Sequence, residues 1–165
     1  MPESNDYVEA NRKAWNEVAP RHATHNQDKL KALLRAGGYN HLCDEMIDMF
    51  SRVGVAGKSV VQVGCNNGID LVSVKGMGAG GCLGIDQADA FLEQARDLAA
   101  TAGYDDVTFH QANVYDLPCE MTGHFDLAMT TIGVIGWMPD LEGFFEAVTR
   151  LLKPGGYWVM EEMHP

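Results

Sequence analysis

Two glycines and two asparagines form the segment of this chain with the clearest potential to bind a ligand. The stretch Gly64-Cys65-Asn66-Asn67-Gly68 follows the β-branched run "SVVQV" and precedes a helix-like segment. Such turns between a strand and a helix bring the backbone close to nucleotide-like ligands. Asp86 ends the next apolar run, 22 residues after Gly64. Its carboxylate could accept hydrogen bonds from both ribose hydroxyls of an adenosine, or could cap the helix that starts near Ala88.

The glycine spacing favours one class of nucleotide-like ligand over another. A dinucleotide pyrophosphate requires G-x-G-x-x-G, and here Asn66 and Ile69 would replace the second and third glycines. The pattern G-x-G-x-G fits better, with Asn66 at the middle position between Gly64 and Gly68. Asparagine tolerates the left-handed backbone conformation that such a position can require. The turn therefore favours an adenosine without pyrophosphate, with a nicotinamide dinucleotide as the weaker alternative.

Alternating strands and helices must position this turn. Short apolar runs predict five strands, and amphipathic stretches predict helices between them. This alternation is typical of an α/β protein with a doubly wound, mainly parallel sheet, whose ligands bind where the strands end. The strands are expected within residues 59–63, 80–86, 106–114, 124–135 and 157–163, and the clearest helices within 87–103 and 140–152, the latter followed by a turn at 153–156.

The first third of the chain reads as helical. The spacing of apolar residues predicts helices over residues 6–19, ended by Pro20, over about 27–36, and over a third stretch ending at Gly54. We expect one domain over residues 1–165, in which a helical cap or lid at 1–56 precedes a Rossmann-like core at 57–165.

Composition narrows the possible partners. The 165 residues carry a formal net charge of -11 and no basic patch, which argues against nucleic acid as a partner. The four cysteines include no CxxC pair, and no Cys/His cluster has zinc-ligand spacing, so no metal site is expected. No apolar run approaches the ~20 residues that span a membrane, and the N-terminus has no signal-peptide pattern. The sequence predicts a cytoplasmic protein without a membrane partner.

Several motifs in order resemble the class I S-adenosylmethionine-dependent methyltransferases, in the branch that acts on small molecules. "VVQVGCNNG" resembles the cofactor-binding motif of that family, and "LGID" its acidic ribose motif. "HQANVYDLP" is similar to the adenine-binding segment, and "LKPGG" to the turn before the fifth strand. "NRKAWNEVAPRHA" resembles the N-terminal helix and lid. The resemblance implies a Rossmann-like sheet of order 3-2-1-4-5 and S-adenosyl-L-methionine as the cofactor.

The resemblance also implies roles for individual residues. Gln62 stands where the family usually has an acid near the methionine amino group. Asn113 replaces an aspartate that meets the adenine amino group, and Thr131 lies below the sulfonium. Trp15 and His22 would close over the methionine end, although Trp15 fits a core position equally well. The cofactor-binding residues expected are Gln62, Gly64, Cys65, Asn66, Gly68, Asp86, Gln87, Asn113, Val114 and Thr131.

The implied reaction is in-line transfer of a methyl group to a small-molecule acceptor. The fourth strand ends in "TTIG" and lacks the Asn-Pro-Pro-aromatic type of motif found in enzymes that methylate nucleic-acid amines. His164 is the candidate general base, with Glu161 or Glu162 as alternatives. A non-catalytic S-adenosylmethionine-binding or assembly domain and, less favoured, an NAD-dependent oxidoreductase remain open.

The family fold usually continues past the fifth strand, so the resemblance implies that its sixth and seventh strands are missing here. The fifth strand would then form a sheet edge rich in apolar side chains, among them Tyr157 and Met160. Such an edge can pair with another chain. A homo-oligomer formed through this edge is one expectation, beside a fragment and a natural short form.

Overall fold

A parallel sheet lies at the centre of residues 2–163, the part of the chain that the computed structural model describes, with the side chains of residues 2–5 and 25 excepted. Its strands are β1 (Val60–Val63), β2 (Cys82–Asp86), β3 (Val107–Gln111), β4 (Phe125–Thr130) and β5 (Leu152–Met160). Their order is β3-β2-β1-β4-β5, and every neighbouring pair is parallel. The predicted doubly wound sheet and its strand order are confirmed.

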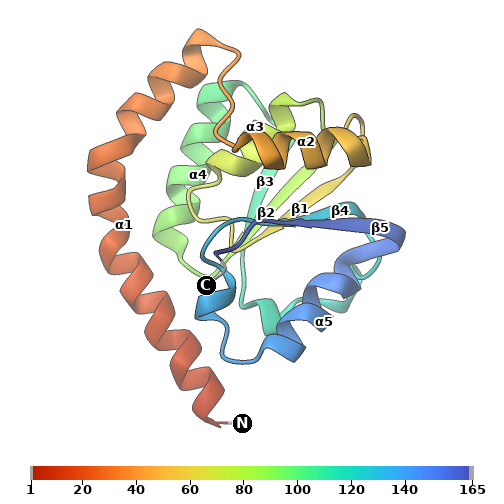
Figure 1. Ribbon diagram of the computed structural model, residues 1–165. Helices are drawn as coiled ribbons and strands as arrows, with labels where there is room; N and C mark the ends of the chain where they lie inside the picture. The colour runs from red at the N-terminus through yellow and green to blue at the C-terminus, as the bar shows by residue number, and fades with distance from the viewer. Residues whose placement is uncertain (1, 164–165) are drawn as a thin grey trace.

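Helices cover both faces of this sheet. In chain order they are α1 (Pro2–Ala36), α2 (Asp44–Val53), α3 (Ile69–Gly76), α4 (Asp89–Ala102) and α5 (Leu141–Leu151), with short 3-10 turns at Val114–Asp116, Cys119–Met121 and Ile135–Trp137. Figure 1 shows α2, α3 and α4 on one face and α5 on the other, while α1 runs along the outside of α4. All four residues of β1 are buried, as expected of a central strand covered on both faces.

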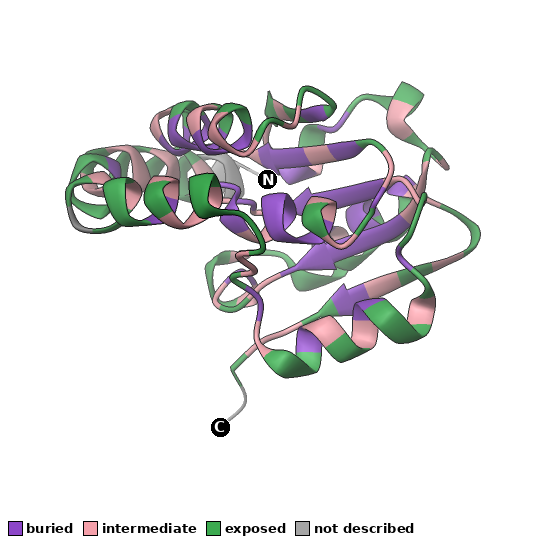
Figure 2. Ribbon diagram, turned by 90° about the horizontal axis from the view of Figure 1, so that it is seen from above, coloured by how far each residue is buried: buried purple, intermediate pink, exposed green. Residues whose placement is uncertain are grey.

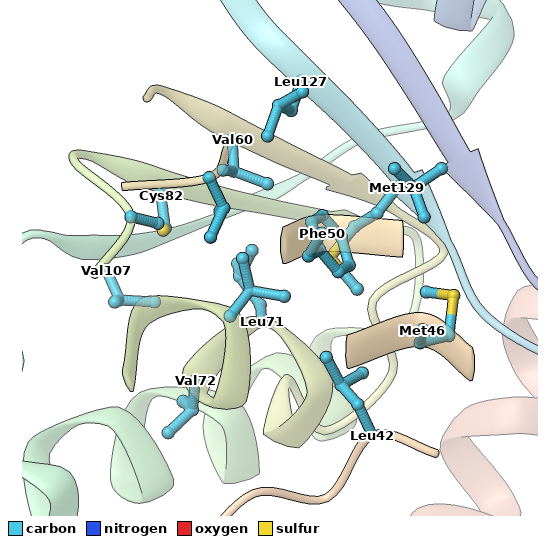
Figure 3. Close-up of a cluster of buried hydrophobic side chains, with 14 of the residues drawn as sticks. Leu42, Met46, Phe50, Val60, Leu71, Val72, Cys82, Val107, Leu127 and Met129 are labelled. Atoms are coloured by element: carbon cyan, nitrogen blue, oxygen red, sulfur yellow. The ribbon is translucent and has the colours of Figure 1, made fainter. Parts of the chain in front are cut away.

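The core has one apolar cluster on each face. Phe50, Met46 and Leu71 pack below β1 and β4 on the side of α2 and α3 (Figure 3). Val63, Phe144 and their neighbours fill the side of α5. The burial colouring of Figure 2 places the buried residues along the central strands and the inward helix faces. With both faces filled, the carboxyl edge of the sheet is left as the place for a ligand.

The N-terminal segment departs from the expected pair of helices. Pro20 lies inside the continuous helix α1, where its lack of an N–H and its ring would ordinarily cost about 3 kcal/mol. Packing on α4 offsets this cost on both sides of the proline. Ala19 is fully buried with Phe91, and its carbonyl oxygen accepts a hydrogen bond from Gln94 Nε2 at 2.9 Å. Further along α1, Gln27 Nε2 donates to Asp97 Oδ2 at 2.8 Å. The expectation of a helix end at Pro20 was wrong because local propensity yields to these long-range contacts.

The turn expected at residues 153–156 lies inside β5. Leu152 pairs with Phe125 and Tyr157 pairs with Leu127, so that residues 153–156 stand opposite Asp126 alone. Gly155 has a φ of +81°, which allows the chain to bulge and return to the same strand. The strand therefore starts earlier than predicted and ends at Met160, which places Glu161–Met163 beyond it.

Candidate functional site

The glycine-asparagine turn has the left-handed backbone that its sequence predicts. Gly64, Asn66 and Gly68 have φ values of +70°, +49° and +71°. Asn66 is the non-glycine residue with positive φ among those described. The explanation for asparagine at the middle position of the pattern is thus confirmed.

Every backbone N–H group from residue 64 to residue 69 donates to an acceptor inside the protein. Two of the acceptors lie at the end of β2: the Ile85 carbonyl oxygen and the Asp86 carboxylate. Asparagine side chains supply two further acceptors. The donor–acceptor pairs are Gly64 and Cys65 to Ile85 O, Asn66 to Asp86 Oδ2, Asn67 to Asn66 Oδ1, Gly68 to Cys65 O, and Ile69 to Asn67 Oδ1. These six donors are therefore not available to phosphate oxygens, which dinucleotide sites bind through such groups.

Asp86 links this turn to the start of α4. Its Oδ2 accepts from the Asn66 N–H at 2.8 Å, and its Oδ1 accepts from the Ala88 N–H at 2.9 Å. Burial raises the pKa of Asp86, while the N–H groups of Ala88, Asn66 and Gln87 oppose the shift. Since a carboxylate offers about four lone-pair positions, both oxygens can still accept ligand hydroxyls. The helix-start role and a ribose role are therefore compatible.

A cavity of about 450 Å³ lies at this edge of the sheet. Its size is within the range of small-molecule sites, roughly 300–1,000 Å³. Asp86 and Thr131 line it from the ends of β2 and β4, and α1 closes one side. Eight of the ten cofactor-binding residues predicted from the sequence lie in its wall: Gly64, Cys65, Asn66, Asp86, Gln87, Asn113, Val114 and Thr131.

The two other predicted residues lie behind that wall. Gln62 is fully buried, and its Nε2 donates to Thr131 Oγ1 at 3.1 Å. Its Oε1 is buried and has no hydrogen-bond partner among the described residues. At Gly68 a Cβ atom would lie 2.7 Å from the ring of Phe109 and 2.8 Å from Ala95, so that glycine is required there for packing. His164 lies outside the described residues.

Asn113 has a fixed amide orientation. Its Oδ1 accepts from the Tyr115 N–H at 3.1 Å, and its Nδ2 donates to Asp116 Oδ2 at 3.0 Å. The oxygen keeps one lone pair for an exocyclic amino group. Val114, the next residue along the chain, is buried in the same wall.

Aromatic side chains form the side of the cavity next to α1. Trp15 and Trp137 meet edge to face with ring centroids 5.1 Å apart, and Phe91 lies 6.0 Å from Trp15. Asn11 Nδ2 donates to the Trp137 carbonyl oxygen at 3.3 Å, which joins α1 to the loop after β4. Trp15 thus contacts both the cavity and the core. His22, also expected near the ligand, packs on Phe91 at 5.4 Å and is not among the cavity residues.

A histidine–aspartate pair in the wall was missed by the sequence analysis. His41 Nδ1 lies 2.7 Å from Asp70 Oδ1, and both residues line the cavity. The hydrogen bond to Asp70 raises the pKa of His41, and partial burial opposes that shift. Asp70 lies in the first turn of the helix that follows the ligand turn, which was the available sequence signal. His41 comes from the segment between α1 and α2, where no periodicity points to it.

Glu162 holds the opposite wall in place. Its Oε1 accepts from the Gly133 N–H at 2.7 Å, and its Oε2 accepts from the Ile135 N–H at 2.9 Å. Burial acts to raise the pKa of Glu162, but these backbone donors together hold it below its usual value. Neither Glu162 nor Glu161 is among the cavity residues. This geometry favours a structural role for Glu162 over that of a general base.

Comparison with known proteins identifies the family of this fold. The family described as "Methyltransferase domain" matches residues 55–164, about two thirds of the chain. The chain belongs to the methyltransferase domain family. The family resemblance predicted from the ordered motifs is therefore confirmed.

Individual relatives agree with this assignment. The ubiquinone biosynthesis O-methyltransferase of Acinetobacter baylyi is 36% identical over 104 residues, which cover 63% of this chain and 43% of that protein. A solved S-adenosylmethionine-dependent methyltransferase from Mesorhizobium loti is 29% identical, with a TM-score of 0.62, over 73% of this chain and 52% of that one. A Methanococcus maripaludis structure shows the same fold at 16% identity, with a TM-score of 0.67, over 94% of this chain and 64% of that one.

The chain spans less than half the length of the curated relative from Acinetobacter baylyi. Within the described residues, no helix has the length and apolar character required to cross a membrane.

Proposed function

We propose that this chain binds S-adenosyl-L-methionine and transfers its methyl group to a small-molecule acceptor. One observation carries the proposal: the N–H groups of residues 64–69 are already bonded, while the carboxylate of Asp86 faces the same cavity. Such a site suits the hydroxyls of an adenosine and disfavours a pyrophosphate. The same observation weighs against the NAD-dependent alternative.

The residues of the wall fit the parts of this cofactor. Asp86 would accept from the ribose hydroxyls, and Gln87 would lie beside the adenine. Asn113 would accept from the adenine amino group through its remaining lone pair, and the Val114 N–H would face the ring. The turn at residues 64–66 and Thr131 would lie next to the sulfonium, which supplies an electrophilic methyl group when the cofactor is bound.

The protein contributes positioning to the proposed reaction. In-line displacement requires the acceptor atom to face the methyl carbon opposite the sulfur, and fixed alignment of this kind can reach effective molarities of about 10⁵ M or more. The aromatic wall formed by Trp15, Trp137 and Phe91 favours an apolar, planar acceptor. An O-methyltransferase among the relatives supports a hydroxyl as the acceptor group. The general base stays a prediction, with His164 as its candidate.

Calorimetric titration with S-adenosylhomocysteine tests the cofactor. We expect micromolar binding that Asp86→Ala abolishes, with NADH giving no heat. Asp126→Ala is the matched control, because it removes a hydrogen-bonded aspartate that lies outside the cavity. Circular dichroism checks that both variants fold. Absence of binding to folded wild-type protein would refute the proposal.

Turnover separates an enzyme from a binding domain. Release of S-adenosylhomocysteine from S-adenosylmethionine is measured with and without catechol, used as a simple aromatic hydroxyl acceptor. Acceptor-dependent release supports catalysis. Cofactor binding without release across a panel of phenols would favour the non-catalytic S-adenosylmethionine-binding domain.

We also propose one domain over residues 1–165, in which the helices of the first 56 residues cover the core. We propose further that the protein is cytoplasmic.

β5 lies at an edge of the sheet, with Tyr157 56% and Met160 37% exposed. These features support pairing of two copies through this edge. Sedimentation velocity at increasing concentration tests the pairing, and a monomer at every concentration would exclude it.

A further inference from the structure

The cavity contains a second charged group, apart from Asp86. Among the described residues of its wall, the other Lys, Arg, His, Asp or Glu side chains are Lys29, His41 and Asp70. They come from α1, from the segment before α2, and from the first turn of α3. The groups proposed for the adenosine come instead from the ends of β2 and β3. The wall thus offers both signs of charge outside the adenosine region.

The pair formed by His41 and Asp70 is held in a defined position. His41 Nδ1 is 2.7 Å from Asp70 Oδ1, and the His41 N–H donates to Ser73 Oγ at 2.9 Å. Ser73 Oγ in turn donates to the Ile69 carbonyl oxygen at 2.9 Å, within α3. When Nδ1–H donates to Asp70, the protonated imidazole presents its second donor, Nε2–H, to a further acceptor. The exposed fractions of the two side chains, 45% and 20%, leave both accessible from the cavity.

The central strand supplies no charge to this region. Gln62, which the family resemblance places near the amino group of the methionine, is neutral and fully buried behind Thr131. An ammonium group needs an anionic partner to make a charge-assisted hydrogen bond. Asp70 is the carboxylate in the wall that remains once Asp86 is assigned to the ribose.

We infer that Asp70 and His41 bind the amino-acid end of the cofactor, with Asp70 accepting from its ammonium group and His41 donating to its carboxylate. The inference rests on the proposed function and extends it to residues that the family motifs do not mark. The cofactor joins an adenosine to a zwitterion, and this pair supplies the two complementary charges within the same cavity. Lys29, exposed on α1, adds a further positive charge to the same wall.

Three ligands that differ only in this end separate the two contacts. S-adenosylhomocysteine has both charges, 5′-deoxy-5′-(3-aminopropylthio)adenosine keeps the ammonium alone, and 5′-methylthioadenosine has neither. For Asp70→Asn we expect about a tenfold loss of affinity for the first two ligands, the size of one charged hydrogen bond, and less than twofold for the third. For His41→Gln we expect several-fold loss for S-adenosylhomocysteine alone.

The control variant is Asp106→Asn, which breaks an ion pair between Asp106 and Lys75 of α3 outside the cavity. It should change the affinity for none of the three ligands. Equal losses for S-adenosylhomocysteine and methylthioadenosine in Asp70→Asn would mean general distortion and would overturn the inference, as would unchanged affinities. If no adenosine ligand binds wild-type protein, the proposed function itself fails, which is a distinguishable result.

Discussion

Replacing Gly68 by alanine should destabilise the fold through two effects that can be separated. The first is backbone strain, because a φ of +71° costs a residue with a Cβ about 1–2 kcal/mol. The second is overlap, because the new Cβ would lie 2.7 Å from Phe109 Cε1 and 2.8 Å from Ala95 Cβ. Overpacking of this kind costs roughly 1–3 kcal/mol. The total of roughly 2–5 kcal/mol is a large part of the 5–15 kcal/mol of a typical domain.

Gly103→Ala is the matched control for the backbone effect. Gly103 has a φ of +78° at the end of α4, and a Cβ there would meet no atom within 4 Å. Its loss of stability should be the strain alone, about 1–2 kcal/mol. Phe109→Leu should relieve part of the overlap, so that the Gly68→Ala loss measured in that background shrinks toward the Gly103→Ala value.

Urea unfolding followed by far-ultraviolet circular dichroism measures the wild type, the three single variants and the Gly68→Ala/Phe109→Leu double variant. The free energies of unfolding are compared only where their dependence on urea concentration, the m value, is the same. A changed m value would report a change in the unfolded or native ensemble. Equal losses for Gly68→Ala and Gly103→Ala would refute the argument that close packing, rather than φ alone, requires glycine at position 68.

Two further predictions concern the walls of the cavity. Glu162→Gln replaces one acceptor by a donor facing the Gly133 or Ile135 N–H, and should lower the free energy of unfolding by about 1–3 kcal/mol in urea titrations. An unchanged midpoint would contradict the structural role of Glu162. His41 has a pKa raised by Asp70, so its stabilising effect should be complete below the unfolded pKa of about 6.5 and disappear as pH rises through the folded value. Urea midpoints between pH 5 and 9 should show this loss for wild type and not for Asp70→Asn, and identical profiles would contradict it.

The sheet and the ligand turn could be predicted because their signals are local. Apolar runs mark the strands, and Asn66 between two glycines marks a left-handed position before the fold is known. Strand ends of a parallel sheet meet at one edge, which is why Asp86, Asn113 and Thr131 were predicted to lie together. All three line the same cavity.

The remaining features depend on contacts between distant segments. Pro20 stays inside α1 because residues on both sides of it, Ala19 and Gln27, contact α4. No residue near Pro20 in the sequence signals these contacts. His41 and Asp70 are 29 residues apart and meet because the segment before α2 lies on the first turns of α3. For Gln62 the side-chain direction follows from the face on which the strand presents it, and the motif alone does not reveal that its amide lies behind Thr131.

The way α1 is attached bears on how fast a ligand could enter and leave. Its contacts with α4 include a small apolar cluster around Ala19 and several side-chain hydrogen bonds, among them Asn16 to Asp89 at 2.7 Å. The central strand β1, in contrast, pairs with both β2 and β4, and all four of its residues are buried. Segments with few buried contacts open with less free energy than the core. Amide hydrogens of α1 should then exchange faster than those of β1. Because α1 closes one side of the cavity, the residence time of a bound ligand would depend on the rate at which α1 detaches from α4.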